Sequence, residues 1–174
     1  MKRLIMIMCL ALCLIGCGRK SEELSVTTPS GKDISLYMPR EEVEKIIGEP
    51  TESSKLGTLM YGDSDDDLLE IGYTDGLLSL IRIKSDKLKV GEYSLGGNAE
   101  NFDGIIYESE KYDYYIKVYD SQKNIVPLTQ DELAALEGDY REYGRLDITA
   151  TKDGTITDIL ISDKNISMTM KLDK

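Results

Sequence analysis

The 174-residue sequence contains no histidine and no tryptophan, and only one phenylalanine. Without histidine the chain cannot form a Ser-His-Asp or Cys-His catalytic site, and a histidine-rich zinc site is excluded as well. No glycine-rich phosphate loop with its lysine is present. Carboxylates are plentiful, so a hydrolase that uses only a carboxylate pair stays a remote alternative. Acids scattered in this way are more typical of a solvated surface, and we expect no enzyme, no cofactor and no metal.

The first residues have the pattern of an export signal. Lys2 and Arg3 precede an uncharged apolar stretch at residues 4–16. As a helix this stretch would be about 20 Å long, which is short of the ~30 Å hydrocarbon core of a bilayer. A short apolar run behind a basic start predicts a secretory signal peptide at residues 1–16 and not a membrane span.

All three cysteines lie at or before position 17, and the last of them follows Leu14, Ile15 and Gly16. This pattern resembles the lipobox of bacterial lipoproteins, in which a small residue precedes the cysteine that is lipidated. The resemblance implies cleavage before Cys17 and acylation of its thiol, whereas an ordinary signal peptide with an incidental cysteine is the alternative. It places the protein in the bacterial cell envelope, on the outer face of the cell membrane or on an outer membrane. The remaining chain would then have no free thiol for a disulfide or for catalysis.

The charge balance is strongly acidic, with a formal net charge of −11 at pH 7. An acidic chain is repelled by nucleic acids and by anionic lipid surfaces, so we expect no nucleic-acid partner. Membrane attachment therefore has to come from the lipid anchor. Residues 17–32 are polar and small, which predicts a lipidated flexible tether ahead of a domain at residues 33–174.

A short helix is well marked after residue 38. Pro39 favours the first turn, Val43 and Ile46 lie on one face, and Gly48 favours the end of the helix. The next signal is a hairpin that turns at residues 75–76, an Asp-Gly pair that tolerates the positive φ of such turns. We expect Ile46 to be buried against this hairpin.

These features give the chain a family resemblance. A methionine, a glutamate-rich helix, Gly-x-Pro, a strand near Tyr61 and the Asp-Gly hairpin occur in this order within residues 34–84. The segment resembles the repeat unit of BamE/SmpA-OmlA lipoproteins and of β-lactamase-inhibitor-protein-like folds. The resemblance implies an α+β unit that binds proteins outside the cytoplasm and has no active site.

A weaker second copy is indicated at residues 128–162. Thr129 and Glu132 have capping-box spacing, and a second hairpin turns at Asp153-Gly154. The pattern predicts an α+β fold, an antiparallel sheet with short helices packed on one face and possibly two tandem helix-hairpin units. Chance similarity between short segments is the alternative. Residues 166–172 alternate as a further strand would.

Tyrosine is the dominant aromatic residue, with 11 copies, and five of them lie between residues 107 and 119. Alternation along the strand predicted there places Tyr115 and Tyr119 on its wetter face, where they could contact a partner. The alternative is a second layer over them, such as the helix near Leu133. We therefore expect a protein-binding module, an assembly subunit or an inhibitor-like protein of the envelope. A ligand- or glycan-binding surface lipoprotein is the alternative.

One acidic run has a pattern that cation sites share. Asp63, Asp65 and Asp67 alternate as oxygen ligands might be spaced. However, Leu68 and Thr74 stand where a calcium-binding EF-hand loop has glycine and glutamate. The pattern favours a solvated loop between two strands.

Overall fold

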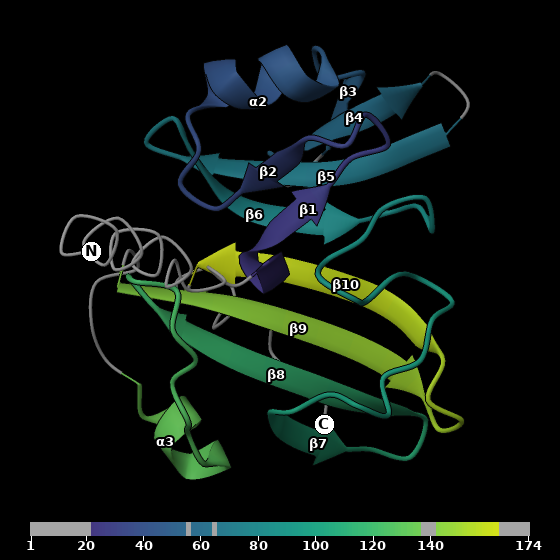
Figure 1. The fold of residues 1–174 in the computed structure, drawn as a ribbon, viewed down its shortest axis with the longest axis vertical. Coiled ribbons are helices and arrows are strands. Elements are labelled where there is room, and N and C mark those ends of the chain that lie inside the picture. The colour runs from purple at the N-terminus through teal and green to yellow at the C-terminus, as the bar shows by residue number, and fades with distance from the viewer. Residues whose placement is uncertain (1–21, 55–56, 64–65, 137–141, 164–174) are drawn as a thin grey trace, which may run out of the picture.

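The computed structural model describes residues 22–54, 57–63, 66–136 and 142–163. Their main feature is one antiparallel sheet of eight strands, in the order β3-β4-β5-β6-β10-β9-β8-β7 (Figure 1). The strands are β3 (Glu52–Ser53), β4 (Leu59–Asp63), β5 (Asp66–Thr74), β6 (Leu77–Ile83), β7 (Ile105–Glu108), β8 (Tyr112–Asp120), β9 (Tyr143–Thr151) and β10 (Ile156–Asp163). A separate two-stranded sheet contains β1 (Ser25–Thr27) and β2 (Asp33–Ser35).

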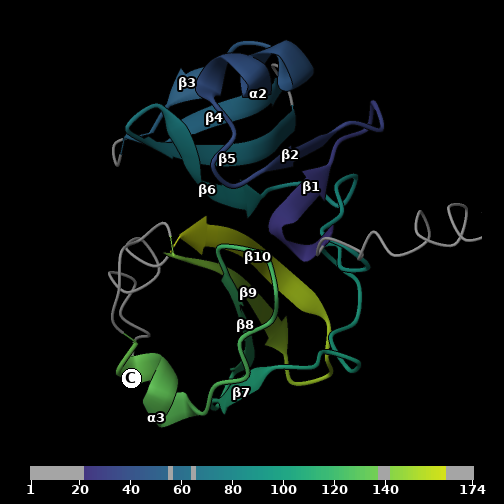
Figure 2. The same ribbon diagram turned by 60° about the vertical axis from the view of Figure 1, so that its left-hand side comes forward.

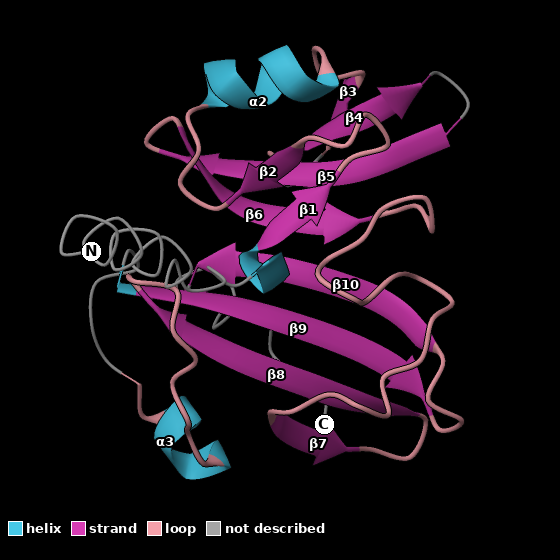
Figure 3. Cartoon of the chain, viewed as in Figure 1, coloured by secondary structure: helices cyan, strands magenta, loops and turns pink. Residues whose placement is uncertain are grey.

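The expected α+β fold with helices packed on one face is wrong. Strands dominate the described residues, which contain only two α-helices, α2 (Arg40–Ile47) and α3 (Gln130–Ala134) (Figure 3). Helix α3 buries no residue. The two predicted hairpins are not tandem units, because β6 pairs with β10 and Ile81 lies opposite Ile161. Each hairpin was recognisable from nearby residues, whereas the pairing that joins them depends on burial across the whole chain.

The local elements of the predicted units are nevertheless present. Helix α2 begins after Pro39 and ends at Gly48, whose φ is 85°. The first hairpin turns at Asp75 and Gly76, both with positive φ. These signals act over a few residues, so they hold in a larger sheet as well as in a small unit.

The hydrophobic core lies between one face of the sheet and a cover formed by segments that precede β7 in the chain. This cover consists of the β1–β2 hairpin, helix α2 and the long connection between β6 and β7, which Figure 2 shows on the same side of the sheet. The cover contributes buried apolar side chains to the core, namely Leu24, Val26, Ile34, Leu36, Val43, Leu88, Val90, Tyr93, Ala99 and Phe102.

The fold also includes part of the segment that we expected to be a tether. The 3-10 helix η1 (Glu22–Leu24) and strand β1 precede the predicted boundary at residue 33. Leu24 and Val26 are both buried in the core. Two apolar residues among serines, threonines and glycines are a weak sequence signal, and the domain therefore begins about ten residues earlier than predicted.

Several sequence predictions lie outside the described residues. They are the signal peptide, Cys17 and the strand expected at residues 166–172. Among the residues that the structure describes, no helix is long and apolar enough to cross a membrane.

Candidate functional site

The candidate site is the sheet edge formed by β7, the start of β8 and the segment that follows β8. Within the described residues, the large hydrophobic side chains that are exposed all belong to this edge. They are Ile106, which is 42% exposed, Tyr112, which is 39% exposed, and Ile125, which is 50% exposed. They are spread along the edge, because Tyr112 begins β8, Ile106 lies opposite Tyr115, and Ile125 lies opposite Tyr119 near the end of β8. Exposed apolar side chains along one edge of an acidic domain are typical of a surface that another molecule covers.

Two segments form backbone hydrogen bonds with the edge of β8 that does not pair with β9. Strand β7 pairs with its first half, where Ile105 lies opposite Ile116. Farther along, the amide of Val126 donates a hydrogen bond to the carbonyl oxygen of Val118 over 2.8 Å. Near the place where one segment gives way to the other lies an open pocket of about 390 Å³, lined by Asp103, Gly104, Ile105, Ile116, Lys117, Val118, Ile125, Val126, Pro127, Leu128, Thr129 and Glu132.

Gly104 allows the chain to enter β7 in contact with β8. A Cβ atom at this position would lie 2.6 Å from the carbonyl oxygen of Ile116 and 2.6 Å from the Phe102 ring. Both distances are too short for any side chain, and the carbonyl oxygen belongs to the backbone of β8, which is paired on both sides. Gly104 therefore determines how closely the pocket wall approaches β8.

Helix α3 covers part of the β7 edge. The side-chain amide of Gln130 donates a hydrogen bond to the carbonyl oxygen of Ile106 over 2.8 Å, and the hydroxyl of Tyr107 donates to the carbonyl oxygen of Gln130 over 3.4 Å. The predicted capping box is present, because Thr129 and Glu132 each accept a hydrogen bond from the other's backbone amide. These hydrogen bonds from Thr129 lower the pKa of Glu132. The polar rim of the site therefore carries an ionised carboxylate at neutral pH.

Tyr119, one of the two predicted binding tyrosines, is not at this surface. Its side chain is 0% exposed, and its hydroxyl donates a hydrogen bond to the carboxylate of Glu23. Burial raises the pKa of this hydroxyl, and the bond to Glu23 raises it further. The prediction that Tyr119 is exposed is wrong, because η1 covers this residue. The helix near Leu133, which we had considered as the covering element, is not the one that contacts its hydroxyl.

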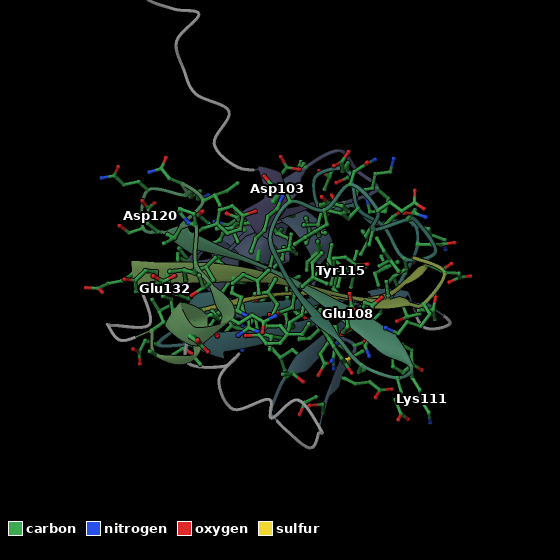
Figure 4. The ribbon with its side chains drawn as sticks, turned by 90° about the horizontal axis from the view of Figure 1, so that it is seen from below. Asp103, Glu108, Lys111, Tyr115, Asp120 and Glu132 are labelled. Carbon is green, nitrogen blue, oxygen red and sulfur yellow. The ribbon has the colours of Figure 1, made fainter. Side chains whose placement is uncertain are left out.

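Tyr115, the second predicted residue, is half-buried. Its ring packs edge-on against Phe102 with the ring centroids 5.5 Å apart, and burial raises the pKa of its hydroxyl. Figure 4 shows it among the acidic residues seen from below. The exposed side chains of Ile106 and Ile125 were not predicted from the sequence. The signal that could have found Ile106 is the short strand Ile105–Glu108, since a short terminal strand exposes one of its edges.

Two carboxylate residues, Asp103 and Glu132, belong to the lining of the pocket at the β7 edge, and Glu132 there accepts the capping hydrogen bonds of Thr129. Two further carboxylates lie outside both pockets. Asp147 pairs with Arg145 over 2.6 Å, and Asp158 pairs with Arg82 over 3.1 Å, on neighbouring strands of the sheet. Burial raises the pKa of Asp147 although Arg145 opposes the shift. We interpret both pairs as ion pairs that balance charge on the sheet.

No cation site is formed by the residues described. They contain no group of three or more histidine, cysteine, aspartate or glutamate residues that could hold a metal ion. In the acidic run, Asp63 ends β4 and Asp66 and Asp67 begin β5, so the described residues of the run belong to strands and not to the loop that we expected. Residues 64–65 lie outside the described part.

A second pocket of about 280 Å³ lies between the end of α2, the β4–β5 hairpin and the β1–β2 turn. Its lining is mainly apolar, with Thr28, Pro29, Ser30, Ile46, Ile47, Tyr61, Gly62, Leu68, Leu69 and Leu88. Binding pockets for drug-sized molecules are usually about 300–1,000 Å³. This pocket lies just below that range, so it suits one bulky side chain or a small apolar molecule.

Residues 34–84, which carry the family resemblance, contribute β2 to β6 and α2 to the fold. They are not a separate unit, because β6 continues the sheet into β10. Comparison with protein-family models, curated proteins and solved structures gives no match for this chain.

Proposed function

We propose that the protein is a bacterial lipoprotein, anchored through Cys17 on the outer face of the cell membrane or on an outer membrane. Its domain binds another envelope protein, as an assembly subunit or an inhibitor-like module, and it has no catalytic activity. The lipobox at residues 14–17 supports the anchor. The exposed apolar residues of the β7–β8 edge support protein binding.

The edge suits a protein partner better than a small ligand for two reasons. Its exposed apolar side chains come from three segments spread along the edge, and one of them, Ile125, lines the open pocket. The rim is acidic, with Asp103, Glu108 and Glu132 around the edge (Figure 4). An apolar centre with a polar rim is the usual anatomy of a protein–protein interface.

Crosslinking in the native envelope tests this proposal. A photoreactive amino acid replaces Ile106 in the full chain, and in a matched control it replaces Glu52 on β3, the opposite edge of the same sheet. We expect a discrete adduct from position 106 only, and its loss when Ile125→Ser is added without a change in melting temperature. Equal adducts from both positions, or an adduct that Ile125→Ser leaves unchanged, would contradict the proposed site.

Cys17→Ser tests the anchor separately. We expect the variant to remain unprocessed or to be released, because no thiol is left to accept the lipid. Normal processing and normal partition into membranes would rule out the lipobox interpretation.

The pocket between α2 and the β4–β5 hairpin supports a second function, binding of a small apolar ligand. Its walls favour an apolar molecule over a glycan, because glycan recognition requires several polar groups aimed at hydroxyls. Leu68→Trp should fill this pocket and abolish such binding, whereas crosslinking from position 106 should be unchanged.

A further inference from the structure

We propose that a basic, extended segment of the envelope partner pairs with the outer edge of β7 and so adds a further strand to the sheet. This inference rests on the proposed protein-binding function. It states how the partner binds and which chemistry its segment has. In the structure the side-chain amide of Gln130 holds the place that a backbone amide of the partner would take.

The outward-facing backbone groups of β7 belong to Ile106 and Glu108. The amide of Ser109, just after β7, donates a hydrogen bond to the carbonyl oxygen of Tyr112 over 3.0 Å. In an antiparallel pair, residues that bond to the neighbouring strand alternate with residues whose backbone groups point away from it. Counted back from Ser109, the odd-numbered residues of β7 therefore bond to β8, and the even-numbered ones face outward. Strand β7 is the last strand of the sheet that the structure describes, so no other strand of this sheet pairs with them.

A side chain covers one of these outward-facing groups. The amide of Gln130 donates to the carbonyl oxygen of Ile106 over 2.8 Å, and the carbonyl oxygen of Gln130 accepts a hydrogen bond from the Tyr107 hydroxyl over 3.4 Å. Gln130 is exposed, and α3, which begins with it, buries no residue. Covering an edge protects it from unwanted pairing. Because so little surface is buried, a partner can displace this cover, and its backbone amide then takes over the bond to Ile106.

The charges around this edge favour a basic partner. Residues 100–111 and 129–134 contain one basic residue, Lys111, and six acidic ones, namely Glu100, Asp103, Glu108, Glu110, Asp131 and Glu132. Two lysines of neighbouring segments are already paired, because Lys152 forms an ion pair with Asp113 and Lys117 forms one with Glu23. Lys123 follows the opposite end of β8. The edge therefore complements a segment that carries lysine or arginine.

A second copy of the chain suits this edge less well. Two β7 strands paired with each other would bring the carboxylates of both copies together, and like charges on paired strands are destabilising. Ile106 is 42% exposed and lies between Asp103 and Glu108 in the chain. A strand that alternates apolar and basic residues can contact both the isoleucine and the acids, since alternate side chains of a strand point to opposite faces.

The experiment uses the full chain and a synthetic peptide in which valine and lysine alternate. Hydrogen exchange followed by NMR reports on the amides of Ile106 and Glu108 individually. We expect the peptide to slow exchange at both amides and to leave the amides of β3, at the opposite edge, unchanged. About 1 M salt should weaken the protection, because the screening length is then about 3 Å.

Two control peptides separate backbone pairing from other modes of binding. One has glutamate in place of lysine, and the other keeps the lysines but is N-methylated at alternate residues, so that one edge lacks its amide donors. Neither should protect the two amides. Equal protection by either control peptide, or no protection by the valine-lysine peptide, would overturn the proposal. These measurements use the unaltered chain, so they do not depend on how any variant folds.

Substitutions at the edge give an independent test. Gln130→Ala should strengthen peptide binding about fivefold, the effect of one hydrogen bond that no longer has to be displaced, whereas Gln122→Ala should leave it unchanged. Ile106→Pro should bind the peptide at least about tenfold more weakly than Ile106→Ala, because proline has no amide to donate. Proline is tolerated where the amide of an edge strand faces outward, so we expect the sheet to be retained. Equal binding by these two variants would contradict strand addition.

The crosslinking experiment distinguishes this inference from the proposed function. If position 106 gives no adduct in the envelope, the proposed function fails. If it gives the adduct but the valine-lysine peptide protects neither amide, the protein-binding function stands and strand addition is wrong. Protection that appears without peptide as the protein concentration rises would identify a second copy of the chain as the occupant, and the basic partner segment would then be wrong.

Discussion

Substitution of Glu23 tests how the first residues of the domain are held in place. Its carboxylate is the partner of both Lys117, which is 6% exposed, and Tyr119, which is fully buried. Glu23→Ala would leave a buried ammonium group and a buried hydroxyl without their acceptor. Breaking a buried pair in this way costs about 3–5 kcal/mol, and the lower end applies because Glu23 itself is partly exposed.

We therefore expect Glu23→Ala to lower the free energy of unfolding by about 3 kcal/mol, and Tyr119→Phe to lower it by about 1 kcal/mol. Urea denaturation of the full chain measures both as shifts in midpoint at constant slope. The double substitution Glu23→Gln with Lys117→Met should recover much of the loss, because it removes both charges together. A loss below about 1 kcal/mol for Glu23→Ala would refute the reasoning, as would strict additivity of Glu23→Ala and Tyr119→Phe in a double-mutant cycle.

Three further predictions concern the core, the pocket and the helix cap. Val43→Ala should lower the free energy of unfolding by about 1–3 kcal/mol, because Val43 is fully buried. Ile46→Ala should lower it by less than the roughly 2–4 kcal/mol expected of a fully buried isoleucine, because Ile46 is only partly buried. Urea denaturation midpoints measure both losses, and a full loss of about 2–4 kcal/mol for Ile46→Ala would contradict the packing. Gly104→Ala should cost at least about 2 kcal/mol, since its Cβ would overlap a backbone oxygen of β8, and an unchanged melting temperature would show that β7 can shift. In an NMR titration the carboxyl of Glu132 should titrate below its ordinary pKa of 4.5, so the cap is complete above this pH and is lost as the pH falls through the lowered pKa. Thr129→Ala should return this pKa toward 4.5, and no change would exclude the hydrogen bonds as its cause.

At the candidate site, the sequence did not predict which side chains are exposed. Tyr115 and Tyr119 were expected at a surface because alternation along a strand identifies two faces. Alternation does not reveal which face a distant segment covers. In the structure η1 covers Tyr119, although nearly a hundred residues separate them in the chain. Exposure of Ile106 and Ile125 depends likewise on β7 being the last strand of the sheet, a property of the strand order.

The sequence by itself determined the features that depend on neighbouring residues. Pro39 and Gly48 set the ends of α2, the Asp-Gly pairs set two hairpin turns, and the absence of histidine excluded whole classes of active site. Only the tertiary structure decided that β6 pairs with β10, so that two apparent units became one sheet, and that the exposed apolar residues gather at its β7 edge. The physical reason is the separation along the chain of the residues whose contacts stabilise each feature. Turns and caps are stabilised by contacts within a few residues, whereas strand order is set by the burial of apolar surface summed over the whole chain.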